Sequence, residues 1–465
     1  MSIQEQSPVS HTNDFTDIQH PSPTEEYTAP DHQPRFTRRQ FLKGAAVVAV
    51  GAIVEPLAKY VPTAEAGKET PRPGTVLSTS IVEIPRHNEP VVAIDVDTHG
   101  AYLASMGDRQ GNLVVAAVTP EGLNRQDFGD NGVSRISFGD HFMDKGTAPS
   151  DKRPNTLLAQ GMGVHTDGKG NVTVIGSVAK MAGDRPSFGI GFVRLDQHGR
   201  EVRGSKAVLQ LDGTPERPIQ DLEVYRTVPL SEGRYAVLGG RTLKKLPTES
   251  QAKQKAFILI LNPDGTPDTR FAGSGVTIRP SERYYQKACD IVELEDGSLM
   301  VGGTYGIDRY EASGEPIYRV DSIDAFMSLA RGRDRVFASI NGAALGSFNP
   351  DLQSGVYTAQ EALGNRWTQV PMPIGVGIND ISANAGDVVW TGSMYVPDRT
   401  EPQLAVGRLG PDLKPDMQFG DYGFATVPQF PSGSGHAVRV QGSQLYVAGR
   451  SSYSQGHVAY ARIQG

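Results

Sequence analysis

Four aspartates and one histidine recur just ahead of short apolar runs, and they are the residues of this chain best placed to act together. They are Asp221, Asp290, Asp324, Asp380 and His436. Carboxylate oxygens are the ligands that a hard cation such as Ca²⁺ prefers, and they also bind polar groups of organic ligands. If the five residues line one channel at one level, the pattern predicts a cation or ligand site there.

A structural role for the same residues stays open. Each aspartate can accept backbone N–H bonds at a strand start, or pair with an arginine of its own or a neighbouring repeat. The arginines in a matching strand are Arg194, Arg309, Arg408 and Arg462. Because perturbed buried charges mark functional sites only statistically, the pattern by itself leaves both roles possible.

The chain has no residue spacing typical of a catalytic centre. Its histidines show neither H-x-x-x-H nor H-E-x-x-H spacing, and no G-x-S-x-G occurs, so zinc and serine hydrolase sites of those types are not predicted. The single cysteine, Cys289, excludes an internal disulfide and is expected to be a core residue. We predict no catalytic residue and no cofactor, with calcium as the one possible metal. The alternative is a hydrolase or lyase that cleaves a carbohydrate or similar polymer through the channel carboxylates.

Seven short apolar runs, most of them ending in glycine and each preceded by turn residues, must position these side chains. Such runs are typical of strands in hairpins. They recur at intervals of 37 to 69 residues, which favours a repeat fold of several strands per unit. The runs occupy residues 101–107, 171–176, 234–239, 298–302, 335–339, 388–392 and 445–449.

A second element, a tight turn followed by an F-G-x-x-G ending, recurs downstream of several runs. Its best copy spans residues 261–276, and the others span 410–423 and 119–133. In its N-P-D-G turn, proline presets φ, aspartate caps and glycine takes positive φ. The pattern resembles the delta-sixty repeat family, and the resemblance covers most of the chain after residue 66. In that family the repeats are thought to be β-propeller blades of four antiparallel strands.

The resemblance implies an all-β, seven-bladed β-propeller of four-stranded antiparallel blades. The last blade shows only three strands, so we expect the spare strand at residues 76–84 to complete it and close the ring. Residues 363–374 are expected to connect two blades. The expected blades are residues 91–142, 154–213, 218–280, 284–320, 321–362, 375–431 and 434–465.

The first 66 residues carry features of an export signal. Residues 37–43 read T-R-R-Q-F-L-K, an apolar stretch follows from Gly44 to Val54, and Ala64-Glu65-Ala66 is a small-x-small site. This order resembles a twin-arginine (Tat) signal; a short buried helix after a basic turn is the alternative. The resemblance implies a leader of residues 1–66, a propeller of residues 67–465, and a periplasmic or extracellular location. The residues that carry the motif are Arg38, Arg39, Phe41 and Leu42, with Ala64 and Ala66 at the cleavage site.

The composition of the chain narrows the classes of partner to be expected. The 465 residues carry a formal net charge of −7 and are 38% hydrophobic, which argues against nucleic acid as a partner. No uninterrupted apolar segment has the roughly 18 residues of a membrane span. Besides the Tat export machinery, we expect a protein or polysaccharide ligand, and a non-catalytic binding or scaffolding role at the cell envelope.

Overall fold

The computed structural model describes most of the chain beyond residue 70, and the described residues belong to one compact unit. The predicted export and cleavage residues and the predicted connection at 363–374 lie outside them. No helix within the described ranges is both long and apolar enough to cross a membrane. The described ranges are 71–82, 91–105, 112–138, 157–182, 185–211, 219–246, 249, 252–279, 286–322, 324–333, 335–342, 344–348, 355–357, 376–384, 386–396, 400–450 and 458–465.

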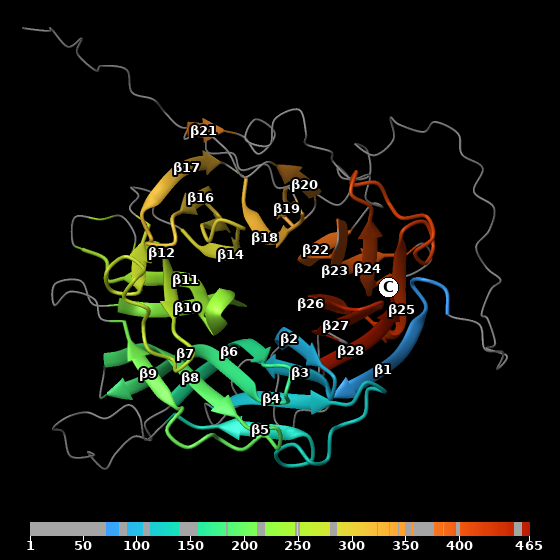
Figure 1. Cartoon of the computed structure of the whole chain (residues 1–465), viewed down its shortest axis with the longest axis horizontal. Helices are drawn as coiled ribbons and strands as arrows, with labels where there is room; N and C mark the ends of the chain where they lie inside the picture. Colours follow the sequence, from blue (N-terminus) through green and yellow to red (C-terminus); the bar gives the residue numbers. More distant parts are fainter. Residues whose placement is uncertain are drawn as a thin grey trace, which may run out of the picture. The chain divides into compact units, whose positions relative to one another are not determined.

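Seven sheets of mostly antiparallel strands surround a central axis as the blades of a propeller, which confirms the predicted fold (Figure 1). We number the blades 1 to 7 in chain order. Blade 1 holds β2 (Val91–Asp97), β3 (Gly100–Ser105), β4 (Leu113–Val118) and β5 (Val133–Ile136). Blade 2 holds β6 (Leu157–Thr166), β7 (Val172–Ala182), β8 (Arg185–Leu195) and β9 (Ala207–Gln210). Blade 3 holds β10 (Ile219–Pro229), β11 (Tyr235–Leu243), β12 (Lys253–Leu261) and β13 (Val276–Ile278).

The remaining blades follow the same order from the channel outward. Blade 4 holds β14 (Ala288–Glu293), β15 (Leu299–Gly303), β16 (Gly306–Tyr310) and β17 (Pro316–Ser322). Blade 5 holds β18 (Phe326–Arg331), β19 (Val336–Ile340) and β20 (Ala344–Phe348). Blade 6 holds β22 (Gly377–Asn384), β23 (Asp387–Tyr395), β24 (Pro402–Leu409) and β25 (Phe424–Pro431). Blade 7 holds β26 (Ser434–Gln441), β27 (Gln444–Arg450), β28 (Val458–Gln464) and β1 (Val76–Val82).

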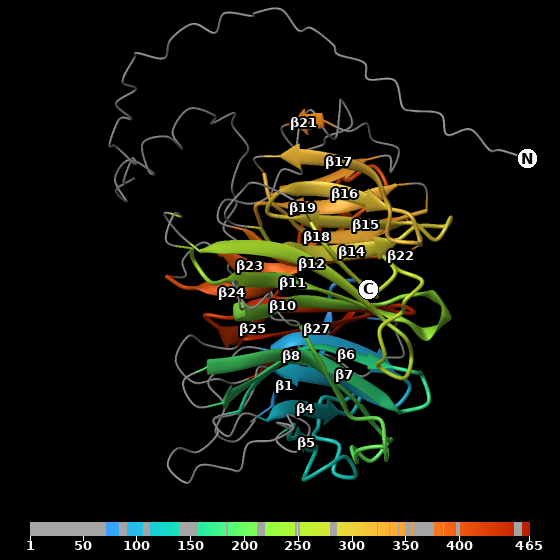
Figure 2. The same ribbon diagram turned by 90° about the vertical axis from the view of Figure 1, so that its left-hand side faces the viewer.

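The first strand of each of blades 1 to 6, and β26 of blade 7, lines the channel, and each lies against the equivalent strand of the next blade. The strands run between the two faces of the ring, at the left and right of Figure 2. Because side chains alternate along a strand, every blade packs both of its faces. In β3, Tyr102 packs toward blade 2, whereas Leu103 packs toward blade 7. The core therefore consists of seven apolar clusters, one at each junction of two blades.

The N-terminal strand closes the ring, as the sequence predicts. β1 pairs antiparallel with β28, from Val76 opposite Ile463 to Val82 opposite Val458. The blade that completes the circle thus takes three strands from the chain end and one from the start, which leaves β28 no open edge.

Blade 5 departs from the expected four strands. Within the described residues it has three, and β21 (Gly355–Tyr357), which falls in its predicted range, pairs parallel with β17 of blade 4 instead. The F-G-x-x-G ending is also missing from this range. The weakest repeat in sequence is therefore also the least regular blade.

The F-G-x-x-G ending forms a contact between blades. Phe128, Phe271 and Phe419 are at most 1% exposed. The residue after each one donates its backbone N–H to the next blade: Gly129 to His198 O (2.7 Å), Ala272 to Ser313 O (2.6 Å) and Gly420 to Pro73 O (2.9 Å). We call this contact the Phe latch. Pro73 lies just before β1, so the N-terminal segment takes the place that an outer turn takes in the other blades.

Candidate functional site

An extra residue interrupts the register of every channel strand. In β14, Ala288 pairs with Gly303 and Asp290 with Gly302, so Cys289 between them is a β-bulge. The same shift occurs in the other six channel strands. We call the residue after this bulge the post-bulge position. Around the ring it holds Ala93, Gly163, Arg226, Asp290, Ser328, Asp380 and Ala437.

Four of these post-bulge residues meet in the channel although they come from blades 3 to 6. Nη2 of Arg226 lies 2.8 Å from Oδ1 of Asp380, and its Nε lies 3.3 Å from Oδ1 of Asp290. The Oγ of Ser328 lies 3.0 Å from Oδ2 of Asp290 and 3.1 Å from Oδ1 of Asp380. The two aspartates are 1% and 0% exposed. We call Arg226, Asp290, Ser328 and Asp380 the Arg226 cluster.

The carboxylates of this cluster also bind backbone groups of the next blade. Oδ2 of Asp290 accepts from the N–H of Leu329, and Oδ2 of Asp380 accepts from the N–H of Val438, both at 2.9 Å. Burial raises the pKa of Asp290; the positive charge of Arg226 opposes that rise and the charge of Asp380 adds to it. Every oxygen of both carboxylates therefore has a partner, and these contacts join blades 3 to 7.

Equivalent links continue on the other side of the channel. Asp95 in blade 1 accepts from the N–H of Thr166 in blade 2 at 2.8 Å. Nε2 of His165 lies 2.7 Å from Oγ1 of Thr227 in blade 3. Burial raises the pKa of Asp95, and the nearby charge of Arg439 from blade 7 opposes the rise. The polar residues of the channel strands thus connect successive blades.

The structure brings together only two of the five residues that the sequence placed at one level. Asp290 and Asp380 share the post-bulge position, but Asp221 lies five residues before Arg226, at a second register shift, and is exposed. Asp324 precedes β18 and accepts from Nδ2 of Asn341 at 2.9 Å. His436 is itself a bulge residue, and burial lowers its pKa to about 4. The predicted alignment was wrong at these three residues because β10 is longer than β14 and because the bulge shifts the register.

The arginines that satisfy the carboxylates differ from those the sequence suggested. Arg309 pairs with Asp296 at 2.7 Å, and Nε of Arg408 bonds Asp416 at the same distance, both away from the channel strands. Arg226 and Arg439 stand beside the channel aspartates instead. Sequence reasoning missed Arg226 because it aligned carboxylates only, whereas the post-bulge position holds residues of several types.

The Arg226 cluster does not fit a calcium ion. Calcium takes six to eight oxygen ligands, but here two carboxylates already accept from a guanidinium, a serine hydroxyl and backbone N–H groups. A cation would have to displace Arg226. No group of three or more His, Cys, Asp or Glu residues suited to a metal occurs within the part of the chain that the structure describes.

Cys289 behaves as a core residue. It is 8% exposed, and burial, with the neighbouring charge of Asp290, raises the pKa of its thiol to about 12. At neutral pH it is therefore a thiol rather than the thiolate that a nucleophile requires.

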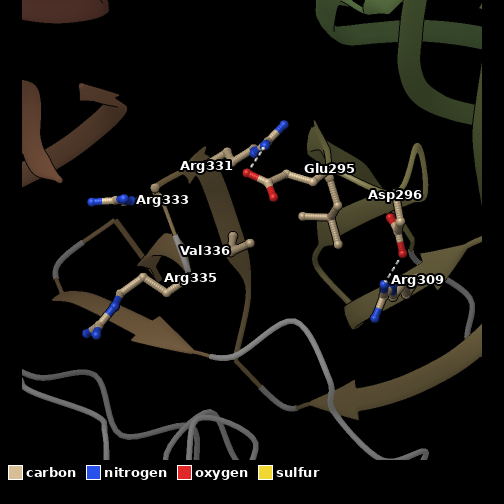
Figure 3. Close-up of a pocket in the computed structure, with 9 residues that line it drawn as sticks. Glu295, Asp296, Arg309, Arg331, Arg333, Arg335 and Val336 are labelled. Carbon is tan, nitrogen blue, oxygen red and sulfur yellow. Dashed lines mark hydrogen bonds and ion pairs between the residues drawn. The ribbon is translucent and has the colours of Figure 1, made fainter. Parts of the chain in front are cut away.

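A second candidate site is a recess between blades 4 and 5, on the face that carries the turns after the channel strands (Figure 3). Its volume is about 260 Å³, and its walls are the turn at Leu294–Asp296, Arg309 of β16 and the turn at Arg331–Val336. Arg331 pairs with Glu295 at 2.8 Å. We call it the arginine recess because four arginines line it. The only sign of it in the sequence is the R-G-R-D-R run at residues 331–335.

Comparisons with known proteins find similar solved structures but no matching family. No protein-family model and no curated protein matches the sequence. Similar solved structures include the computationally designed Ika8 protein, at 10% identity and a TM-score of 0.40, covering 84% of this chain and 100% of that one. A structure titled YCF48 bound to D1 peptide is 12% identical with a TM-score of 0.40, and the match covers 84% of this chain and 98% of that one. The WD40 β-propeller domain of Doa1 is 12% identical with a TM-score of 0.43, and the match covers 84% of this chain and 97% of that one. At these identities and TM-scores the similarities carry no argument about a ligand.

Proposed function

We propose that this chain is an exported, non-catalytic β-propeller that binds a partner protein at the cell envelope. The observation that carries the proposal is the arginine recess, an open hollow built from turns of two blades. A closed ring with seven apolar junctions holds such turns in fixed positions, and binding residues are commonly found on loops held by a rigid scaffold. The channel residues, by contrast, are engaged in holding the blades together.

The alternative of a hydrolase or lyase depends on Asp290 and Asp380 as acid and base. Paired carboxyl groups in glycoside-cleaving enzymes face the bond that they break. Here both carboxyl groups are buried and bonded to Arg226, Ser328 or backbone N–H groups. The geometry therefore supports binding over polymer cleavage.

Export is proposed from the twin-arginine motif and the Ala64-Glu65-Ala66 site. The full chain is expressed in a bacterium with a functional Tat pathway and compared with an Arg38→Lys/Arg39→Lys variant. We expect the wild-type chain to be shortened by cleavage and to be found in the periplasm or medium. We expect the variant to stay full-length in the cytoplasm. Equal export of the two would overturn this part of the proposal.

Partner binding is tested with a photo-crosslinking amino acid placed at Arg333, in the arginine recess, or at Arg203, an exposed residue of blade 2. We expect a defined adduct with an envelope protein from position 333 only. Adducts of equal yield from both positions, or none, would contradict a binding site in the recess. A polysaccharide adduct would make the ligand the other class expected from the sequence.

Calcium is expected not to bind at the channel, because Arg226 holds the place between the two carboxylates. A calorimetric titration with millimolar calcium checks this. Heat that disappears in an Asp290→Asn variant would show that the cluster accepts a cation after all.

A further inference from the structure

The charges of the arginine recess are not balanced. Arg309, Arg331, Arg333 and Arg335 line it, against Glu295 and Asp296. The sequence run R-G-R-D-R also contains Asp334, which lies outside the described residues, and counting its charge still leaves one excess positive charge. The whole chain carries a formal net charge of −7, so the positive charge of the recess is opposite in sign to the net charge of the protein.

The arginines differ in how firmly they are held. Arg309 is 12% exposed and bonds both Asp296, at 2.7 Å, and Ser298, at 3.0 Å. Arg331 is 39% exposed; its Nη1 donates to Glu293 O at 3.2 Å, and its Nη2 pairs with Glu295, which is 79% exposed. Arg333 is exposed and makes no hydrogen bond or ion pair within the described residues. Figure 3 shows Arg333 and Arg335 extending from the turn away from Glu295 and Asp296.

The pair between Arg331 and Glu295 is weak because both side chains are solvated. Exposed ion pairs contribute little to stability because water screens the two charges. A carboxylate from another molecule can therefore take the place of Glu295 at little cost, and an arginine fork binds a carboxylate through two parallel hydrogen bonds. Leu294 and Val336, both buried, form the apolar part of the recess wall.

We propose that the arginine recess binds an acidic peptide segment of the partner protein, with Glu295 as a built-in competitor. In the free protein Glu295 holds Nη2 of Arg331 while Nη1 donates to Glu293 O. On binding, a carboxylate of the peptide replaces that of Glu295, and Arg333 binds a second carboxylate. This inference rests on the proposed binding function and names the chemistry of the segment recognised.

The test measures fluorescence anisotropy of a labelled hexaglutamate peptide with the full-length chain, using a hexaglutamine peptide as the neutral control. We expect hexaglutamate alone to bind, and more weakly at higher salt, because screening reduces attraction between exposed charges. Arg333→Gln and Arg331→Gln should each weaken binding about fivefold, and Glu295→Gln should strengthen it about twofold to fivefold. Arg203→Gln, which removes the same charge from blade 2, should change nothing.

Four results would overturn the inference. If Arg203→Gln weakens peptide binding as much as the recess variants do, the peptide is attracted by net charge alone. If Glu295→Gln weakens peptide binding, Glu295 is not a competitor. Tighter binding of polygalacturonate than of hexaglutamate, with the same dependence on Arg333, would mean an acidic polysaccharide ligand. If the envelope-protein adduct at position 333 forms but is unaffected by Arg331→Gln and Glu295→Gln, the binding function stands and the acidic segment is wrong.

Discussion

At the scale of single residues, the contacts of the channel aspartates do two things: they satisfy buried carboxylates, and they join neighbouring blades. Asp290 and Asp380 are fully enclosed, and an enclosed carboxylate requires partners for its oxygens. Arg226, Ser328 and backbone N–H groups supply them from three different blades. Two of the five residues that most resemble a functional site in the sequence therefore hold adjacent blades in register.

Removing Asp380 should destabilise the fold rather than abolish an activity. Breaking a buried ion pair from one side leaves Arg226 uncompensated, and such changes cost about 3–5 kcal/mol. We expect Asp380→Ala to lower the free energy of unfolding by that amount in urea titrations. Asp221→Asn, at an exposed carboxylate, should stay within about 0.5 kcal/mol of wild type. An Asp380→Asn protein that keeps wild-type stability but loses a measurable turnover would instead favour the enzyme alternative.

His165 should make the fold sensitive to acid. Burial lowers its pKa from 6.5 to about 3, and the charges of Arg439 and Arg226 act in the same direction. Because the folded state favours neutral His165, the contribution of this residue to the free energy of unfolding is complete above about pH 6.5. That contribution is lost as the pH falls toward 3. Wild type should lose about 2 kcal/mol between pH 7 and pH 5 through this residue. His165→Gln should remove that part of the slope in denaturation curves at the two pH values.

His198 provides the control for this measurement. Its side chain is 41% exposed, so His198→Gln should leave the slope between pH 7 and pH 5 as in wild type. If His165→Gln and His198→Gln have the same slope, His165 does not set the acid sensitivity of the ring.

At the scale of elements, the repeated turn and F-G-x-x-G ending form a connector between blades. The phenylalanine fills the apolar junction, and the next residue donates its N–H to a turn of the following blade. Inside the loop, Gly275 donates to Phe271 O at 2.7 Å and Gly132 donates to Phe128 O at 2.8 Å. Gly275 takes φ of 80°, in a region that other residues rarely adopt, and so the motif requires glycine there.

Truncating one Phe latch should loosen one junction. Phe271→Ala should destabilise the protein by about 3–5 kcal/mol, because it removes a buried ring between blades 3 and 4. Leu123→Ala, at a residue that is 68% exposed in a turn of blade 1, should cost under about 0.5 kcal/mol. Urea unfolding followed by fluorescence measures both. Equal effects would mean that the motif is only a turn and not a connector.

At the scale of the whole molecule, ring closure joins the two ends of the propeller. β1 supplies the outer strand of blade 7, and the segment just before it accepts the Phe latch of blade 6 at Pro73. The apolar junctions on both sides of blade 7 thus depend on a blade that only the complete chain can form. A ring of this kind is expected to unfold as one cooperative unit when it is closed.

Deleting residues 71–82 should open the ring. The edge of β28 would then be unpaired, and open edges promote association between molecules. We expect a broader, lower-temperature unfolding transition by calorimetry and self-association in sedimentation experiments. Deleting residues 5–16 removes the same length ahead of the twin arginines and should leave the transition unchanged. A sharp wild-type transition after loss of β1 would show that closure by this strand is dispensable.

The sequence by itself determined the repeats, the strand chemistry, the seven blades and the closing strand, because short apolar runs and turn residues are local signals. It did not determine which polar residues meet. The bulge before the post-bulge position moves His436 off the level of Asp290 and puts Arg226 where Asp221 was expected. A strand that is buried on both faces, such as β14, shows no apolar alternation for a bulge to interrupt. The contacts of the Arg226 cluster also join residues up to blade 7. Only the tertiary structure, in which backbone register and ring geometry act together, could therefore assign those partners.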